Sequence, residues 1–412
     1  MTLRVVFLDH TTSPGGAQLA LARLLAAGAG WDATVVVPRG PLGAYSGLGG
    51  QVVRQAGPPH RPGAIGGGAG AQARNAVAVL RQVAALVAVR EVRAADVLYA
   101  NSARSAVYTA LTASVLRVPF VVHLRDAVTP EALGRWGLAA MTRLVLPRAA
   151  GVVANSRYTL GVAAAAAPLP TLRVVVPSPV GDMFDPPPPP PRARVERVGM
   201  VARIAPWKGQ ALLLDAFARA FPDGDVTLHL AGAPLFGEEK YRNHLRERAG
   251  ELGVAHRVTL HGHVEDVRGF VDSLDIAVHC ATAPEPLGQN VLQYLARGRA
   301  VVAAREGGPA ELVRDGGTGL LVAPRDPAEL AVALRTLAAD GQLRQALARR
   351  AAAAPVPDAD ELATATAEFL SRVTAARRAP GARAEPSAPP LGRAARESRP
   401  GSRPGPGAAR RS

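Results

Sequence analysis

The sequence predicts an α/β protein made of two doubly wound domains, each with a parallel sheet covered by helices. Short apolar runs typical of buried strands alternate with segments of helical periodicity along the 412 residues. Hydrophobic residues make up 48% of the chain, which is enough for two large cores. Six consecutive prolines, Pro186 to Pro191, interrupt the alternation and can form only an extended spacer. We therefore expect one domain on each side of the prolines, with a ligand between them at the carboxyl ends of the strands.

The expected strands form one group before the prolines and a second group after them. The first group is Leu3–Leu8 followed by residues 34–38, 97–101, 120–124, 151–155 and 173–176. The second group is residues 197–201, 226–231, 258–261, 276–279, 301–304 and 319–322. These groups predict a first domain over residues 1–184, a linker over 185–192 and a second domain over 193–357. Residues 57–70, although rich in glycine, are predicted to be a loop, because no strand precedes them.

In the first domain, polar or glycine-rich turns follow several of the expected strands. The first strand leads through Gly15 and Gly16 into a helix expected over 17–27, and such a glycine pair lets the backbone approach a ligand closely. The strand over 120–124 has His123 as its second-last residue and is followed by Arg-Asp. Two further strands end in Asn-Ser pairs, for which helix capping is the favoured role, and a place at the cleft for Asn101 and Ser156 is the alternative.

In the second domain, the segment from Val198 to Phe217 joins an apolar strand to a helix through a basic loop. Arg203 and Lys208 lie five residues apart in this loop, so they can grip a diphosphate, arginine through its planar fork and lysine as a point charge. The chain has only two lysines, and one of them is Lys208. The alternative is a solvated basic loop without a ligand.

A third segment, from Pro284 to Asp326, combines a carboxylate with two predicted helix starts. Glu285 precedes a Pro-x-Gly turn, and Gly288 opens an amphipathic segment over 289–297. Backbone N–H groups at this helix start are expected to face the same ligand as Glu285. A second helix start at Ala310 follows a Glu-Gly-Gly-Pro loop, so two helix N-termini are expected to converge on one cleft.

These segments resemble the family-four retaining glycosyltransferases, of the "glycosyl transferases group 1" type. The signature of that family is two glutamates separated by seven residues in a phrase like EPFGxxxxEAxAxGxPVVA, followed by GGxxE and a G-x-L-V-x-P ending. The first glutamate is Glu285, but Gln293 stands at the position of the second, and Leu287 replaces the usual phenylalanine. An amide oxygen accepts a hydrogen bond without charge, so we expect looser donor binding with the chemistry retained.

The resemblance implies the GT-B architecture, in which two Rossmann-like domains face each other across a cleft and a last helix, residues 358–373, returns to the first domain. It implies that His123 and Glu285 contact the transferred sugar, although a purely structural role for His123 remains open. The remaining assignments are the donor diphosphate for Gly15, Gly16, Arg203, Lys208 and Gly288, and the donor sugar or ribose for Gln289, Asn290 and Gln293.

The implied activity is transfer of a sugar from a nucleoside diphosphate sugar to a hydroxyl of a glycan or lipid-linked acceptor, with retention, and without metal or cofactor. No carboxylate is placed as an obvious nucleophile, which favours a front-face path. A non-catalytic nucleotide-sugar-binding protein is the main alternative, and Gln293 favours it. Another GT-B enzyme, such as a sugar-nucleotide epimerase or a phosphorylase, is a further alternative, although no cofactor lysine for a phosphorylase is found.

The net charge of +15 raises the question of anionic partners. Residues 374–412 hold nine arginines and two glutamates, and are predicted to be a disordered tail that either binds an anionic membrane or only reflects a biased composition. Nucleic acid is not an expected partner, because aromatic residues make up 4% of the chain and no recognition motif is present.

Cysteine and hydrophobic patterning bear on the compartment. The single cysteine, Cys280, permits no internal disulfide, which indicates a reducing environment. Neither a secretion signal nor an apolar run of about 18 residues is recognised, so we expect a cytoplasmic protein, and peripheral contact at the inner membrane face depends on whether the basic tail binds lipid. The pair His261 and His263 lacks cysteine or carboxylate ligands nearby, so no metal site is expected there.

Overall fold

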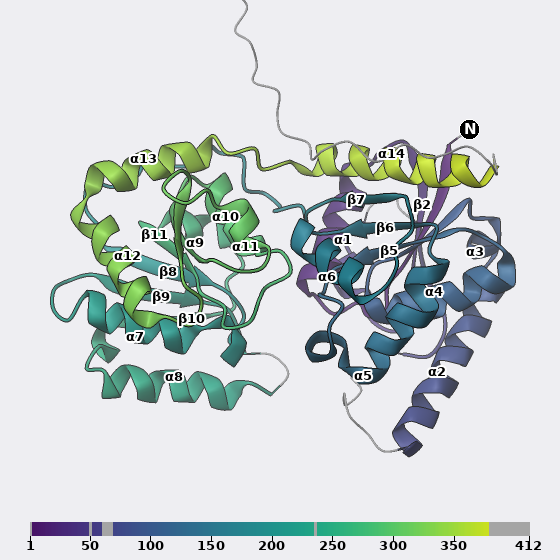
Figure 1. Ribbon diagram of the computed structural model, residues 1–412, viewed down its shortest axis with the longest axis horizontal. Coiled ribbons are helices and arrows are strands. Elements are labelled where there is room, and N and C mark those ends of the chain that lie inside the picture. The colour runs from purple at the N-terminus through teal and green to yellow at the C-terminus, as the bar shows by residue number, and fades with distance from the viewer. Residues whose placement is uncertain (1, 49–51, 60–68, 235–236, 379–412) are drawn as a thin grey trace, which may run out of the picture.

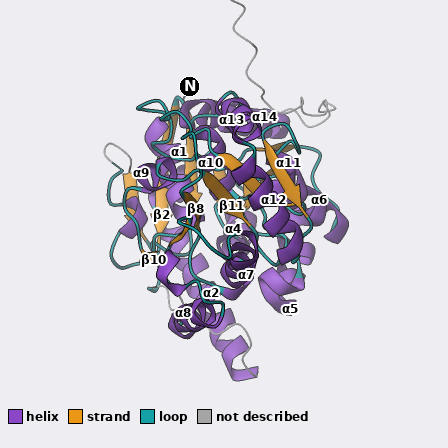
Figure 2. Cartoon of the chain, turned by 90° about the vertical axis from the view of Figure 1, so that its left-hand side faces the viewer, coloured by secondary structure: helices purple, strands orange, loops and turns teal. Residues whose placement is uncertain are grey.

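The computed structural model describes residues 2–48, 52–59, 69–234 and 237–378, which fold into two lobes (Figure 1). Each lobe contains one sheet with helices packed against it. The second lobe, viewed end-on in Figure 2, shows its strands enclosed by helices.

The described elements are as follows. The strands are β1 (Leu3–Leu8), β2 (Trp31–Val37), β3 (Val52–Gln55), β4 (Val97–Ala100), β5 (Phe120–Leu124), β6 (Gly151–Ala154), β7 (Arg173–Val175), β8 (Arg197–Val201), β9 (Thr227–Ala231), β10 (Val258–Gly262), β11 (Ile276–His279), β12 (Ala300–Ala304) and β13 (Gly319–Val322). The α-helices are α1 (Gly16–Ala27), α2 (Ala69–Ala88), α3 (Arg90–Ala94), α4 (Ala103–Leu116), α5 (Pro130–Ala140), α6 (Arg157–Ala166), α7 (Gln210–Ala220), α8 (Glu239–Glu251), α9 (Val267–Asp272), α10 (Gln289–Ala296), α11 (Pro309–Leu312), α12 (Pro327–Ala339), α13 (Gly341–Ala352) and α14 (Ala359–Arg378).

Both sheets are parallel and doubly wound. The first has the strand order β3-β2-β1-β4-β5-β6-β7, and the second has the order β10-β9-β8-β11-β12-β13. In each sheet the order reverses direction once, between β1 and β4 and between β8 and β11, which creates a topological switch point. The predicted class of two doubly wound Rossmann-like domains is confirmed.

Every described strand except β3 was predicted. The central strands are apolar and buried because helices cover both faces of a parallel sheet, and this makes them easy to recognise. Strand β3 is a four-residue edge strand, and half of it is Arg54 and Gln55. Such a short, half-polar segment gives no clear apolar run. Most of the predicted loop over 57–70 lies outside the described residues.

Helix α14 connects the end of the second domain back to the first. It lies along the first domain in Figure 1, where it packs against α1. Leu362, Phe369 and Val373 are buried in one core with strands of the first sheet. A Cβ at Gly151 would lie 2.8 Å from Cζ of Phe369, so glycine permits this close packing. The predicted end of this helix at residue 373 is wrong, because good helix formers extend it to Arg378, and the rest of the predicted tail lies outside the described residues.

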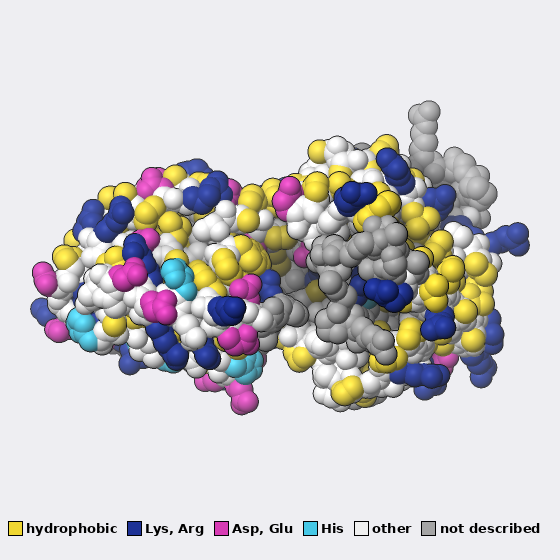
Figure 3. Space-filling model, turned by 90° about the horizontal axis from the view of Figure 1, so that it is seen from below, with side chains coloured by type: hydrophobic (Ala, Val, Ile, Leu, Met, Phe, Trp, Pro, Cys, Tyr) yellow, Lys and Arg dark blue, Asp and Glu magenta, His cyan; other side chains and the backbone are white. Residues whose placement is uncertain are grey.

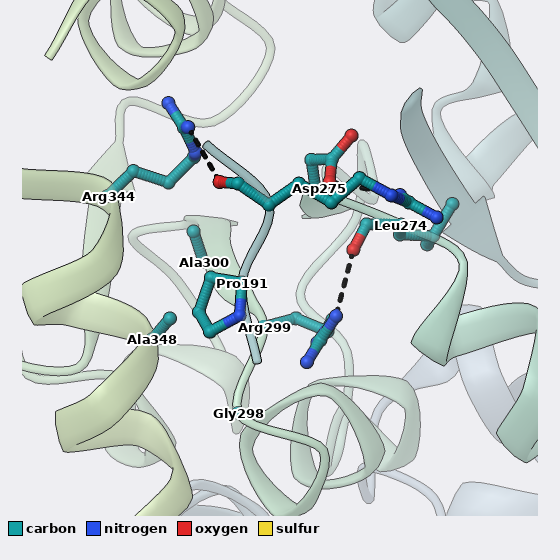
Figure 4. A pocket seen from close by; sticks show the side chains of 9 residues that line it. Pro191, Leu274, Asp275, Gly298, Arg299, Ala300, Arg344 and Ala348 are labelled. Carbon is teal, nitrogen blue, oxygen red and sulfur yellow. Dashed lines mark hydrogen bonds and ion pairs between the residues drawn. The ribbon is translucent and has the colours of Figure 1, made fainter. Parts of the chain in front are cut away.

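The proline segment is attached to the second domain. Nη1 of Arg297 donates to the carbonyl of Pro186 at 2.6 Å, and Nη2 of Arg299 donates to that of Pro189 at 2.6 Å. Arg344 donates to the carbonyl of Arg192, directly after the last proline (Figure 4). The prolines are therefore fixed along the second domain by hydrogen bonds from buried guanidinium groups. The carbonyls of an extended proline segment can accept these bonds, because the segment has no internal hydrogen bonds of its own.

The charged surface differs between the lobes. Seen from below in Figure 3, the second-domain lobe shows acidic and basic side chains intermixed, whereas the charged side chains on the described surface of the other lobe are mostly basic. No helix in the described part of the chain is both long enough and apolar enough to cross a membrane.

Candidate functional site

The predicted ligand-binding residues follow the strands that flank the two switch points. Gly15 and Gly16 come after β1, Arg203 and Lys208 come after β8, and Glu285 comes after β11. The loops after neighbouring strands on either side of a switch point diverge, which leaves a crevice at the carboxyl ends of the strands.

Glu285 is the centre of a buried charged group. Nζ of Lys208 lies 2.7 Å from Oε1 of Glu285, and Nε2 of His279 lies 2.8 Å from Oε2. Burial alone would raise the pKa of Glu285, but the charge of Lys208 and the hydrogen bond from His279 outweigh it and hold the pKa well below its usual range. The carboxylate is therefore ionised at any ordinary pH and accepts hydrogen bonds on both oxygens.

Trp207 supports both predicted diphosphate ligands. The 3₁₀ turn Pro206–Lys208 places the indole so that Nζ of Lys208 is 4.2 Å and Cζ of Arg203 is 5.5 Å from a ring centroid. Cations at these distances are attracted to the aromatic face. The backbone N–H of Thr282 donates to the carbonyl of Trp207 at 2.8 Å, which ties this loop to the one that carries Glu285.

Glycines that precede α10 and α11 allow close packing around the loop that carries Glu285. Gly307 has φ +66°, and a Cβ there would lie 2.5 Å from the carbonyl oxygen of Glu285. The N–H of Gly308 donates to that same oxygen at 2.8 Å. Gly288 has φ +79°, and a Cβ there would meet the ring of Pro309 at 2.7 Å. The starts of α10 and α11 are therefore adjacent, and glycine is needed where their loops touch.

Gln289 reaches the first domain from the start of α10. A Cβ added to Gly16 would lie 3.5 Å from Oε1 of Gln289, and Nε2 of Gln289 lies 3.5 Å from the carbonyl oxygen of Pro179. The structure thus brings together two residues that were predicted to contact the donor from opposite domains.

The other two predicted ribose-site residues are largely buried in α10. Nδ2 of Asn290 donates to the carbonyl of Val201 at 3.1 Å, and its Oδ1 accepts from the N–H of Val291 at 3.0 Å. Nε2 of Gln293 lies 3.5 Å from the carbonyl oxygen of Val180, at the limit of hydrogen bonding. Asn290 is engaged at both ends of its amide, and the contact of either residue with a donor stays a prediction.

His123 lies inside the first domain. Its side chain is 1% exposed, and Nδ1 lies 2.5 Å from the hydroxyl of Tyr99. Burial, together with the charge of Arg125, holds the pKa of His123 well below its usual range. Nε2 is also buried and has no hydrogen-bond partner among the described residues. The imidazole of His123 is therefore paired with Tyr99 inside the domain, and contact of His123 with a sugar stays a prediction.

A polar network joins the carboxyl ends of the central strands of the first sheet. The buried carboxylate of Asp9 accepts from the hydroxyl of Tyr45 at 2.7 Å and from Nδ2 of Asn101 at 2.6 Å. Oδ1 of Asn101 in turn accepts from Arg125 at 2.9 Å. Burial would raise the pKa of Asp9, but hydrogen bonds from His10, Tyr45 and Asn101 lower it below its usual range. The network fixes the loops that form the first-domain side of the crevice.

The two domains also touch at the N-terminus of α6. Oγ of Ser156 accepts from the N–H of Thr159 at 2.9 Å, which caps the helix, and also donates to the carbonyl of Pro286. Glu311, from α11 of the second domain, accepts from the backbone N–H of Arg157 at 3.0 Å and from that of Tyr158. A carboxylate at a helix N-terminus is favourable because it meets unsatisfied N–H groups and the positive end of the helix dipole.

Comparison with known families covers both domains. The model of the family "Glycosyl transferases group 1" matches residues 186–354, and that of the "Glycosyl transferase 4-like domain" matches residues 15–179. The chain belongs to the group 1 glycosyltransferase family. Each match covers one of the two lobes of the structure, so the family resemblance of the sequence is confirmed.

Named relatives match part of this glycosyltransferase-family chain. It is 37% identical over 150 residues to the lipopolysaccharide core biosynthesis glycosyltransferase LpsE of Rhizobium meliloti (strain 1021), covering 36% of this chain and 42% of LpsE. It is 38% identical over 161 residues to the D-inositol 3-phosphate glycosyltransferase of Geodermatophilus obscurus, covering 37% of this chain and 36% of that protein. The chain therefore aligns with well under half the length of either relative.

A solved structure matches nearly the whole chain. Anabaena HepE, crystallised in complex with UDP and glucose, superposes with a TM-score of 0.76 at 29% sequence identity, covering 90% of this chain and 99% of HepE. The likeness extends over both domains.

Four residues of the crevice were missed by sequence reasoning: Asp9, Trp207, His279 and Glu311. Asp9 directly follows a buried strand, and His279 is the last residue of one, so both stand where parallel strands deliver functional side chains. Glu311 was present in the GGxxE phrase but received no role. Trp207 lies between Arg203 and Lys208 in the sequence, and no local signal separated it from an ordinary loop residue.

The predicted absence of a metal at His261 and His263 stays a prediction. Nε2 of His261 lies 2.9 Å from Nδ1 of His229, on the neighbouring strand. Within residues 2–48, 52–59, 69–234 and 237–378, no three His, Cys, Asp or Glu side chains form a group that could hold a metal ion.

Proposed function

We propose that the chain transfers a sugar from a nucleoside diphosphate sugar to a hydroxyl of a glycan or lipid-linked acceptor, with retention of configuration and without metal or cofactor. The observation that carries the proposal is the meeting of Lys208 and Glu285 at 2.7 Å beside the switch point of the second sheet. A cation suited to a diphosphate and a carboxylate suited to sugar hydroxyls are thus adjacent, as the two halves of such a donor are.

The proposed chemistry depends on charge that develops on the leaving diphosphate. Arg203 and Lys208 stabilise this charge together with the backbone N–H groups at the start of α10, after Gly288. Glu285 holds hydroxyls of the sugar and orients the reacting carbon. Trp207 supports this division, because Nζ of Lys208 lies 4.2 Å and Cζ of Arg203 lies 5.5 Å from a ring centroid of its indole, which keeps the two cations near each other.

The proposed path is a front-face displacement. The bond from the anomeric carbon to the phosphate oxygen breaks, and the bond to the acceptor oxygen forms on the same face of the sugar. The proton of the acceptor hydroxyl passes to an oxygen of the leaving phosphate. This path accounts for retention without a protein nucleophile.

Donor identity is proposed only as a class. HepE holds UDP and glucose, which supports a uridine donor, and a guanosine donor is the alternative to be tested. Gln293 in place of the family glutamate predicts loose binding of the ribose, since its amide offers no charge.

A second candidate function is non-catalytic binding of a nucleotide sugar. The observation that favours it is Gln293, which is buried with its amide beside the carbonyl of Val180. The charged residues of the two motifs, Arg203, Lys208 and Glu285, are of the types that transfer requires, so we favour catalysis.

We further propose a cytoplasmic location with peripheral contact at an anionic inner membrane face. The basic excess of +15 supports attraction to such a surface, and the buried Cys280 is compatible with a reducing compartment. Sedimentation of the protein with vesicles that contain an anionic lipid, but not with neutral vesicles, tests the membrane contact.

The test of the main proposal is a screen of UDP-glucose, UDP-galactose and GDP-mannose for hydrolysis and for transfer to glycan acceptors, with and without EDTA. We expect turnover of at least one donor that EDTA does not abolish, and a product of retained anomeric configuration by NMR. Tight binding of a donor without any turnover would establish the binding protein instead. Loss of turnover in EDTA would refute metal independence.

A further inference from the structure

A histidine at the end of the central strand of the second sheet contacts the key carboxylate. His279 is the last residue of β11, which lies between β8 and β12, and its side chain is 3% exposed. Its Nε2 lies 2.8 Å from Oε2 of Glu285, six residues further along the chain. Its other ring nitrogen, Nδ1, is buried and has no hydrogen-bond partner among the described residues.

We propose that His279 is a positioning residue of the donor site, which holds Oε2 of Glu285 so that the carboxylate faces the donor sugar. The inference rests on the proposed function, because it assigns a role in the sugar-binding half of that same site. His279 acts through Glu285 and is not proposed to touch the donor.

The geometry fixes the direction of the hydrogen bond. An ionised carboxylate only accepts, so Nε2 of His279 must carry the proton and donate it to Glu285. The two oxygens are then held by different donors, Oε1 by Lys208 and Oε2 by His279. The last torsion of a glutamate is soft, and two donors on two oxygens define the plane of the carboxylate. Each oxygen keeps a further lone pair for a sugar hydroxyl.

The two donors differ in how firmly they are held. Lys208 is a long side chain in a loop, and the negative charges of a donor diphosphate compete with Glu285 for its ammonium group. His279 is a short side chain in a buried strand, with the carbonyl and N–H groups of that strand engaged in the sheet. When a diphosphate attracts Lys208, His279 is the side chain that keeps Glu285 in place.

The unpaired Nδ1 argues against a purely structural role. A buried polar atom without a partner costs free energy, and an apolar side chain of similar size would fill the same space without that cost. The imidazole stands at a position where its single side-chain hydrogen bond goes to the carboxylate of the site, and such local exceptions are typical of functional residues.

The test compares His279→Leu, which removes the donor, with His279→Gln, whose amide nitrogen reaches about as far as Nε2 and can still donate. The exposed His256, which takes no part in the site, provides the matched control His256→Leu. For the donor that the wild type turns over, we expect kcat of His279→Leu to fall about ten- to a hundredfold, as for loss of a hydrogen bond to a charged group. We expect His279→Gln to stay within about fivefold of the wild type.

Measurements of ligand binding distinguish a positioning role of His279 from damage to the fold. Since UDP or GDP alone lacks the sugar, its dissociation constant, measured by calorimetry, should stay within about twofold in His279→Leu, while that of the complete donor weakens. In a Glu285→Ala background, His279→Leu should have little further effect on kcat, because the two residues act as one unit.

Each outcome decides the question. An active wild type with kcat of His279→Leu within about twofold overturns the positioning role but leaves the proposed function intact. Equal losses in His279→Leu and His279→Gln, or additive losses with Glu285→Ala, show that the ring only fills space and overturn it as well. A wild type inactive with every nucleotide sugar overturns the proposed function, and the inference with it.

Discussion

Replacement of Lys208 by alanine tests the charge arrangement of the crevice most directly. The ammonium group lies 2.7 Å from Glu285, and the two side chains are 14% and 13% exposed, so the pair is largely but not wholly buried. If Lys208 stabilises the leaving diphosphate, its loss should lower kcat about 10²- to 10³-fold, or about 3–4 kcal/mol, as for removal of one preorganised donor.

The same replacement should also destabilise the second domain. Glu285 would keep His279 as its side-chain partner but lose its counter-charge. Removing one member of a fully buried pair costs about 3–5 kcal/mol, and partial exposure reduces this to about 2 kcal/mol here. A loss of that size lowers the melting temperature of a domain of this size by about 4–8 °C.

Lys240 makes a matched control, because it is the only other lysine of the chain and lies exposed on α8. Lys208→Ala and Lys240→Ala are compared by initial rates with a saturating donor and by thermal unfolding. Lys240→Ala should match the wild type in both measurements. If kcat of Lys208→Ala stays within about threefold of the wild type, the reasoning is refuted and the diphosphate binds elsewhere.

Four further predictions follow from the same site and fold. Glu285→Gln removes the charged acceptor for the donor sugar and should lower kcat about 10²-fold with little change in UDP affinity, as measured by initial rates and calorimetry. Gln293→Glu should raise donor affinity several-fold, by about 1 kcal/mol, with kcat unchanged, and weaker binding would show that this position does not meet the ribose. Phe369→Ala should destabilise the protein by about 3–5 kcal/mol in denaturant unfolding, because it empties the contact between α14 and the first sheet. The depressed pKa of Glu285 makes its stabilising contribution complete above its unfolded value of about 4.3, so the free energy of unfolding should fall as the pH drops below that value, and should fall less in Glu285→Gln.

The fold was largely predictable because its signals are local. The buried strands of the second sheet, such as β12, are short apolar runs, and the helices between them have regular apolar spacing. Strand β3 was not predicted, because it lies at the edge of its sheet, where a strand is less completely covered and can carry polar residues. The sequence did not show that α14 continues beyond residue 373, because the Arg- and Ala-rich composition of its last residues continues past the end of the helix.

The residues of the crevice were predictable where a motif marks them. The basic loop and the Pro284 to Asp326 segment pointed to Lys208 and Glu285, which the structure places in contact although they are 77 residues apart. Sequence alone did not pair them, since that contact depends on β8 and β11 being neighbours in the sheet. It also gave no sign that Glu311 caps α6 from the other domain, 153 residues away from Tyr158.

Two histidines show most clearly what the sequence alone could not decide. The sequence by itself determined that the chain forms two doubly wound domains and that polar residues gather at strand ends, because strand and helix spacing is set by near neighbours. It favoured His123 as a site residue and passed over His279, although each lies at the end of a central strand. Only the tertiary structure decided that His123 meets Tyr99 within the first domain and that His279 meets Glu285 in the crevice. The physical reason is that successive side chains of a strand point to opposite faces, so the role of each residue depends on which element covers its face and which loop returns to it.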